Sequence, residues 1–196
     1  NFTEMVKQQA KAMGLPLENL NLIHDMVRKC SYVCSFHINE YESAALWSIY
    51  SKERQGVAIQ STFGRLCDCF KNYPDNPIHI GMISYIDYTT ATIAVDLNAF
   101  LPLLHKRKSF EFEKELRAAI AFPKEFFPEP KVAPPAGFFN SHRGLLIPVD
   151  LDILIERIYV APTTEPWVKE LFISITKTYG LDTPIEQSSL DASPIL

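Results

Sequence analysis

The stretch FEFEKELRA, residues 110–118, alternates carbon-rich and charged side chains. In an extended chain successive side chains point to opposite faces. One face would then carry Glu111, Glu113, Glu115 and Arg117. Glu113 and Glu115 would lie roughly 6.6 Å apart along the strand, close enough to address one ligand. Crowded carboxyl groups of this kind serve proton and glycosyl transfer, because one is protonated while the other stays ionised.

Two other interpretations of this stretch stay open. Apolar residues at i, i+4, i+7 and i+8 also fit a helix, on which Glu111 and Glu115 would form a surface row; these residues are Phe112, Leu116, Ala119 and Ile120. A row of charges on either element is commonly just a solvated face. The unbroken alternation from Phe110 to Glu113 favours the strand.

Aromatic residues mark a second candidate surface. Asn39, with Glu42 three residues later, is a capping signature for a helix in NEYESAALWSIYS, residues 39–51. Trp47 and Tyr50 share a side of this helix and could stack on a flat ring, although aromatic residues on an amphipathic helix more often pack in a core.

Three polar residues are further candidates. His37 ends the strand-like stretch SYVCSFH and could be a general base or a ligand, or a histidine with a structural hydrogen bond. In QSTFGR a predicted strand turns into a helix at Ser61 and Thr62, which could offer hydroxyl and backbone N–H groups to a phosphate. The glycine-rich phosphate-binding pattern is incomplete there.

Composition narrows the class of protein. The 196 residues are 47% hydrophobic, enough for the core of a single domain, and the net charge of -4 disfavours a broad polyanion-binding surface. Lys106, Arg107 and Lys108 form the one dense basic run, so a nucleic-acid partner stays open. No window reaches the about 18 apolar residues of a membrane span, and we expect a cytoplasmic protein without a membrane partner.

The small number of cysteines and the absence of known catalytic motifs argue against several chemistries. The four cysteines are too few for a disulfide framework, and their spacings fit reduced residues better than a zinc site. The sequence contains no serine-hydrolase elbow, zincin or Walker motif. We therefore expect no metal.

The element pattern predicts one α+β domain over residues 1–196, with a mixed, strongly bent β-sheet flanked by helices. We expect helices at 2–13, 19–30, 39–51, 64–72, 98–106 and 164–180, and strands at 31–37, 56–62, 78–88, 110–118, 144–150, 156–162 and 183–190. In the last helix, Trp167, Leu171 and Ile175 are expected in the core. A proline-rich loop, residues 122–137, should close a cleft formed by the acidic strand and the Trp47/Tyr50 helix.

Residues 31–190 resemble the bacterial domain-of-unknown-function 2971 family. The resemblance rests on the order and spacing of four stretches: YVCSFHINEYESAALWSIYSKERQGVAIQST, KSFEFEKELRAAI, IERIYVAP and PIEQSSL. The helical residues 1–30 precede it. The family name implies no activity.

The same order of parts is more distantly similar to the ADP-ribosyltransferase fold, in which a hydroxyl-bearing strand precedes a strand with Glu-x-Glu. This resemblance implies Glu113 and Glu115 as the catalytic pair, with Glu115 stabilising the ribosyl cation as nicotinamide leaves NAD. The hydroxyl strand would be Ser35 to His37 or, alternatively, Ser61 and Thr62. The expected nucleotide-binding set is Ser35, His37, Trp47, Tyr50, Ser61, Thr62 and Arg117.

Three functions follow as hypotheses. The first is an NAD-consuming ADP-ribosyltransferase-like enzyme, a toxin or defence effector, with a nucleotide substrate and a separate acceptor. The second is a non-catalytic nucleotide- or protein-binding module. The third is a nuclease whose carboxylates hold Mg²⁺.

Overall fold

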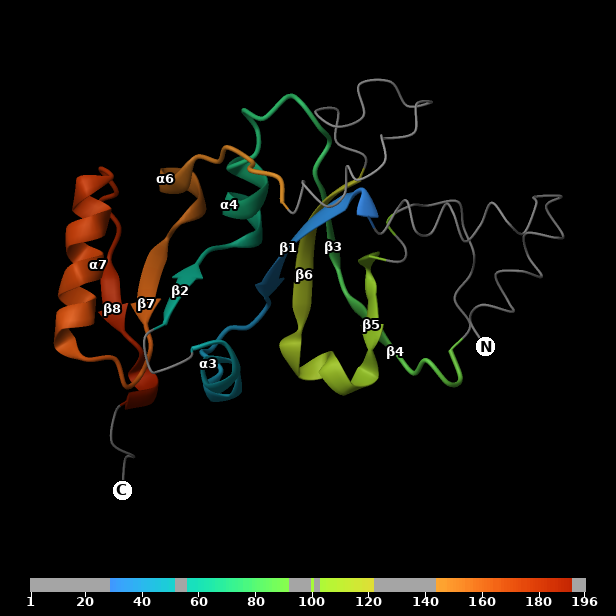
Figure 1. Cartoon of the computed structure of the whole chain (residues 1–196), viewed down its shortest axis with the longest axis horizontal. Helices are drawn as coiled ribbons and strands as arrows, with labels where there is room; N and C mark the ends of the chain where they lie inside the picture. Colours follow the sequence, from blue (N-terminus) through green and yellow to red (C-terminus); the bar gives the residue numbers. More distant parts are fainter. Residues whose placement is uncertain (1–28, 52–55, 92–99, 101–102, 122–143, 192–196) are drawn as a thin grey trace, which may run out of the picture. The chain divides into compact units, whose positions relative to one another are not determined.

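A computed structural model describes the chain in five stretches (Figure 1): residues 29–51, 56–91, 100, 103–121 and 144–191. The predicted helices before residue 29 and the proline-rich loop at 122–137 lie outside these residues. Within the described stretches, no helix has both the length and the apolar character needed to cross a membrane.

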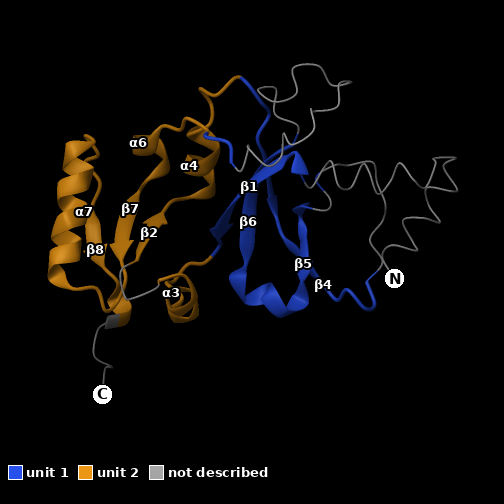
Figure 2. Cartoon of the chain, viewed as in Figure 1, with its two compact units in different colours: residues 1–38, 75–146 blue, residues 39–74, 147–196 orange. Residues whose placement is uncertain are grey.

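The chain divides into two compact units, coloured blue and orange in Figure 2. Unit 1 takes residues 1–38 and 75–146, and unit 2 takes residues 39–74 and 147–196. Each unit therefore combines an early segment with a late one, and no single linker separates them. The prediction of one domain over the whole chain stays a prediction.

Unit 1 contains an antiparallel sheet in the order β1-β6-β3 and a parallel pair, β4 and β5. Its elements are β1 (Ser31–His37), β3 (His79–Met82), β4 (Ser84–Ile86), β5 (His105–Arg107), the 3₁₀ helix η3 (Lys108–Glu113) and β6 (Glu115–Ala121). The central strand β6 buries Leu116, Ala118 and Ile120 on one face. The other face carries Glu115 and Arg117, because side chains alternate along a strand.

Unit 2 contains a second small sheet, in which β2 pairs antiparallel and β8 pairs parallel with the central β7. Its elements are α3 (Ala44–Tyr50), β2 (Val57–Gln60), α4 (Phe63–Asp68), α6 (Leu151–Leu154), β7 (Arg157–Val160), α7 (Pro166–Thr178), β8 (Ile185–Gln187) and the 3₁₀ helix η4 (Ser189–Asp191). Val160 of the central strand is fully buried, as expected for a strand paired on both edges.

The α+β class is confirmed, but the single bent sheet is wrong for the described residues, whose strands form three small sheets. The predicted strand at 144–150 has no strand pairing, and the predicted helix at 98–106 gives way to β5 at its end. Helix α3 is capped by the Ser43 hydroxyl, which accepts from the Leu46 N–H, and not by Asn39.

The opening stretch is a strand only in its second half. Residues 108–113 form η3, and Lys114 takes the left-handed conformation (φ 38°, ψ 57°) that ends it. Strand β6 then begins at Glu115. The alternation at 110–113 was misleading because Glu113 turns back toward β5, where it meets Lys106.

Helix α7 lies within the predicted range 164–180, but the face that it buries is not the predicted one. Trp167, Leu171 and Ile175 are 56%, 47% and 40% exposed, so their assignment to the core is wrong. The buried stripe consists of Val168 and Thr176, each one residue further along the helix. One residue corresponds to about 100° of rotation, so two adjacent apolar stripes compete for the same role.

We predict that replacing Lys114 stabilises or destabilises unit 1 according to the new residue's tolerance of positive φ. Lys114→Gly removes the side chain that makes the left-handed conformation costly, and should raise the free energy of unfolding by up to about 1 kcal/mol. Lys114→Val should lower it, because β-branched residues tolerate this conformation least. Urea denaturation measures both. A glycine variant less stable than the valine variant would contradict the assignment.

Candidate functional site

Glu115, the first residue of β6, is a carboxylate with only 6% of its surface exposed. Arg117, two residues along the same face, donates to both of its oxygens: Nε lies 2.9 Å from Oε1 and Nη2 lies 3.1 Å from Oε2. A two-point guanidinium–carboxylate contact is among the strongest hydrogen-bonded pairs in proteins. Within the predicted row of Glu111, Glu113, Glu115 and Arg117, the last two residues therefore form a pair of opposite charges.

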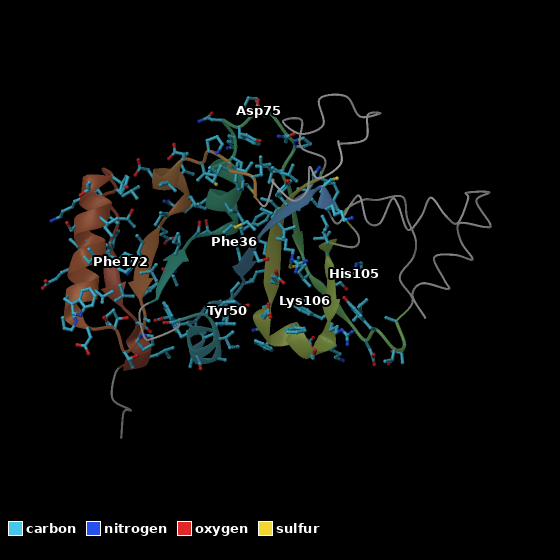
Figure 3. The ribbon with its side chains drawn as sticks, in the orientation of Figure 1. Phe36, Tyr50, Asp75, His105, Lys106 and Phe172 are labelled. Atoms are coloured by element: carbon cyan, nitrogen blue, oxygen red, sulfur yellow. The ribbon has the colours of Figure 1, made fainter. Side chains whose placement is uncertain are left out.

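Lys106 on β5, which is labelled in Figure 3, connects the two predicted catalytic glutamates. Its Nζ lies 2.5 Å from Oε2 of Glu113 and 3.3 Å from Oε2 of Glu115. The Phe110 ring lies 4.9 Å from the same ammonium group. Two carboxylates and two cations thus balance each other, which removes the like-charge repulsion expected between Glu113 and Glu115. We call Lys106, Glu113, Glu115 and Arg117 the charge cluster.

The cluster keeps Glu115 ionised. Burial works to raise the pKa of this carboxyl, but hydrogen bonds from Arg117 and Ser35 and the charges of Arg117 and Lys106 outweigh it, and the pKa lies below its ordinary value. Burial likewise works to lower the pKa of Lys106, yet its contacts with Glu113 and Glu115 raise it. At neutral pH both groups are charged.

Backbone contacts fix the cluster in place. The Glu115 N–H donates to the Tyr85 hydroxyl at 2.8 Å, and the Glu115 carbonyl accepts from the Ile83 N–H at 2.9 Å. Arg117 also donates through Nη1 to the carbonyl oxygen of Leu103. The chain after β3 and the chain before β5 are thereby attached to β6.

Strand β1 adds two of the predicted residues to the same face. In the register, Ser35 lies opposite Arg117 and His37 lies opposite Glu115. The Ser35 hydroxyl hydrogen-bonds to the Glu115 carboxylate, and His37 Nδ1 lies 2.6 Å from the backbone oxygen of Glu113. Unit 1 therefore brings together five of the predicted site residues: Ser35, His37, Glu113, Glu115 and Arg117.

Lys106 and Tyr85 also belong to this face, and sequence reasoning did not place them there. Lys106 stood out only as part of a basic run, which suggested a surface patch rather than the partner of two glutamates. Tyr85 lies inside the predicted strand at 78–88, where no feature of the sequence marks it as a candidate site residue.

The aromatic candidates lie in unit 2. The Trp47 indole N–H donates to Oε2 of Glu42 at 2.9 Å, and Oε1 of Glu42 accepts from the Ser189 N–H at 3.1 Å. Burial works to raise the pKa of Glu42, but the hydrogen bonds from Ser188, Trp47 and Ser189 lower it. Tyr50 is 67% exposed. That Trp47 and Tyr50 share a cleft with the charge cluster stays a prediction, since the two sets belong to different units.

The other hydroxyl candidates in unit 2 have backbone partners. Ser61 Oγ donates to the Leu154 carbonyl at 2.6 Å, and Thr62 Oγ1 caps α4 by accepting from the Arg65 N–H at 3.2 Å. Arg65 itself donates to the Asp152 and Ile155 carbonyls at 2.8 and 2.9 Å. These contacts join α4 to α6, so the presence of Ser61 and Thr62 is explained without a ligand. Their role in nucleotide binding stays a prediction.

Neither zinc nor magnesium gains a site from the described residues. Among them, no three histidine, cysteine or acidic side chains gather closely enough to hold a metal ion. Cys30, Cys34, Cys67 and Cys69 are free thiols.

Comparison of the chain with protein-family models, with curated proteins and with solved structures yields no significant match. The two resemblances drawn from the sequence, to the bacterial family and to the ADP-ribosyltransferase fold, stay predictions.

We predict that Glu115→Gln destabilises the protein although the side chain keeps its shape. The substitution leaves Arg117 and Lys106 with one buried negative charge fewer, and losing a hydrogen-bonded charged partner costs about 2 kcal/mol. Glu111→Gln is the matched control, because Glu111 is exposed and outside the cluster; its effect should stay within about 0.5 kcal/mol. Urea denaturation at neutral pH measures both. Equal effects of the two substitutions would show that the cluster does not stabilise the fold.

The acid dependence of stability should also trace to Glu115. A carboxyl whose pKa is lower in the folded than in the unfolded protein contributes stability above its unfolded pKa, and this contribution is lost as the pH falls through the folded pKa. The parent should therefore lose stability below about pH 4.3, the ordinary glutamate value. Glu115→Gln should show a shallower loss in denaturation series from pH 7 to pH 3. Parallel curves for the two proteins would contradict the lowered pKa.

Proposed function

We propose that unit 1 carries an NAD-consuming, ADP-ribosyltransferase-like site centred on Glu115. The observation that supports it most directly is the hydrogen bond from Ser35 on β1 to Glu115 on β6. The resemblance to that fold implies a hydroxyl-bearing strand and a glutamate-bearing strand at one site, and in unit 1 these two strands are direct neighbours. Of the two alternatives for the hydroxyl strand, this favours Ser35 to His37.

In this proposal Glu115 acts as a fixed negative charge. As the bond between ribose and nicotinamide breaks, the electron pair leaves with nicotinamide and the ribosyl carbon becomes positive. An ionised carboxylate beside that carbon stabilises the developing charge, and a preorganised group does so without first having to reorient. Arg117 holds the carboxylate in one orientation through its two-point contact.

Glu113 has a separate part in the same proposal. Lys106 lies closer to Glu113 than to Glu115, at 2.5 against 3.3 Å. Glu113 thereby draws the ammonium group of Lys106 away from Oε2 of Glu115. More of the negative charge of the Glu115 carboxylate is then available to a substrate cation. NAD is the proposed substrate and no metal takes part. The role of toxin or defence effector rests on the resemblance alone.

A non-catalytic nucleotide- or protein-binding module is the second candidate. It is favoured by the completeness of the charge cluster, in which both oxygens of Glu115 already have cationic partners and little of the side chain is exposed. A closed ion cluster of this kind can support a binding surface without taking part in chemistry.

We predict that the protein releases nicotinamide from NAD, in the presence of cell lysate as a source of acceptor. Glu115→Gln should lower the rate by about 10²- to 10³-fold, the usual cost of one electrostatic contact to a transition state. Glu111→Gln should release nicotinamide at the parent rate.

The measurement is made below the unfolding temperature of each variant, so that lost activity is not lost structure. Three equal rates would remove Glu115 from catalysis. If the parent releases no nicotinamide, the enzyme is rejected and calorimetric titration with NAD then tests the binding module.

A further inference from the structure

His37 lies next to the charge cluster but is not one of its members. It is the last residue of β1, its side chain is exposed, and it lies opposite Glu115 in the antiparallel register. Side chains directly opposite in such a pair lie on the same face, with their Cβ atoms roughly 5 Å apart. An exposed imidazole therefore stands at the solvent side of the buried carboxylate.

One ring nitrogen of His37 is already committed. Nδ1 lies 2.6 Å from the backbone oxygen of Glu113. A carbonyl oxygen can only accept a hydrogen bond, so Nδ1 carries the proton and donates. In the neutral ring this leaves the lone pair on Nε2, which has the chemistry of a general base.

The loop after η3 holds the ring in this position. The Ile38 N–H, next along the chain, donates to the Lys114 carbonyl at 2.9 Å. The left-handed turn at Lys114 thus binds the end of β1 through two neighbouring carbonyls, one to the His37 ring and one to the backbone. The charged groups on this face are Glu113, Glu115, Lys106 and Arg117, which neutralise one another.

We propose that His37 is the general base that activates the acceptor; this rests on the proposed NAD-consuming function. The bond between ribose and nicotinamide breaks, and nicotinamide leaves with the electron pair. The acceptor oxygen forms the new bond to the ribosyl carbon, and its proton passes to Nε2 of His37. The proton is later released to water, so no oxidant, reductant or metal is required.

This role selects the class of acceptor. A hydroxyl group or water must lose a proton as it attacks, and a neutral imidazole can take it. A carboxylate acceptor has no proton to lose, and a guanidinium holds its proton too tightly for imidazole to remove. This role fits an acceptor that loses a proton as it attacks, such as an alcohol, a phenol, a ribose hydroxyl or water.

His37→Asn is the first test, because its side-chain amide can keep the hydrogen bond to the Glu113 carbonyl while the basic nitrogen is lost. His37→Gln is the second variant, should the first fail to fold. Nicotinamide release in water should fall by about 10²-fold or more. Azide is an anionic nucleophile that needs no base, so adding it should restore release in the His37 variants but not in Glu115→Gln.

Each result decides the matter. Restoration by azide in the His37 variants alone supports the proposal. Folded His37 variants with the parent rate, or slow variants that azide does not restore, overturn it while leaving the NAD-consuming function intact. A parent protein without nicotinamide release rejects the proposed function, and this inference with it.

Discussion

The contact between Arg117 and Glu115 is the constraint on which unit 1 depends. A buried carboxylate costs several kcal/mol unless opposite charge and hydrogen bonds compensate it. Both residues lie on the central strand β6, and three other segments supply their partners: β1 supplies Ser35, β5 supplies Lys106, and the chain before β5 supplies the Leu103 carbonyl. The small sheet is held by its polar face as well as by its apolar one.

Sequence patterns predicted the helices and strands whose formation depends mainly on residues close together in the chain. Strands β1, β2, β7 and β8 and helices α4 and α7 follow from β-branched runs and helical periodicity. The half-helical, half-extended stretch 108–121 could not be predicted, because its break at Lys114 serves a contact between Glu113 and Lys106. Likewise the periodicity of α7 predicts a helix but not which of two adjacent stripes faces β8.

The sequence indicated which residue types could form a candidate site, but not which side chains they contact. The sequence singled out Ser35, His37, Glu113, Glu115 and Arg117. Strand pairing brings four of them to one face, and Glu113 joins them through its contact with Lys106. The sequence presented the glutamates as crowded like charges, whereas the fold places a cation beside each. Charge alternation along one segment cannot reveal a lysine supplied by another strand. The missing cations explain why the expected repulsion between Glu113 and Glu115 is absent, while the role of these residues in a site stays a prediction.

The interleaving of the two units has a consequence for how the chain is made. Strand β1 pairs with β6 and β2 pairs with β7, so each sheet waits for a partner far along the sequence. During synthesis, unit 1 cannot complete its sheet until residue 121 has left the ribosome, and unit 2 cannot until residue 187 has. Such non-local pairing slows folding and leaves strand edges open meanwhile. Protection of the nascent chain by a chaperone would matter more here than for two domains that follow one another.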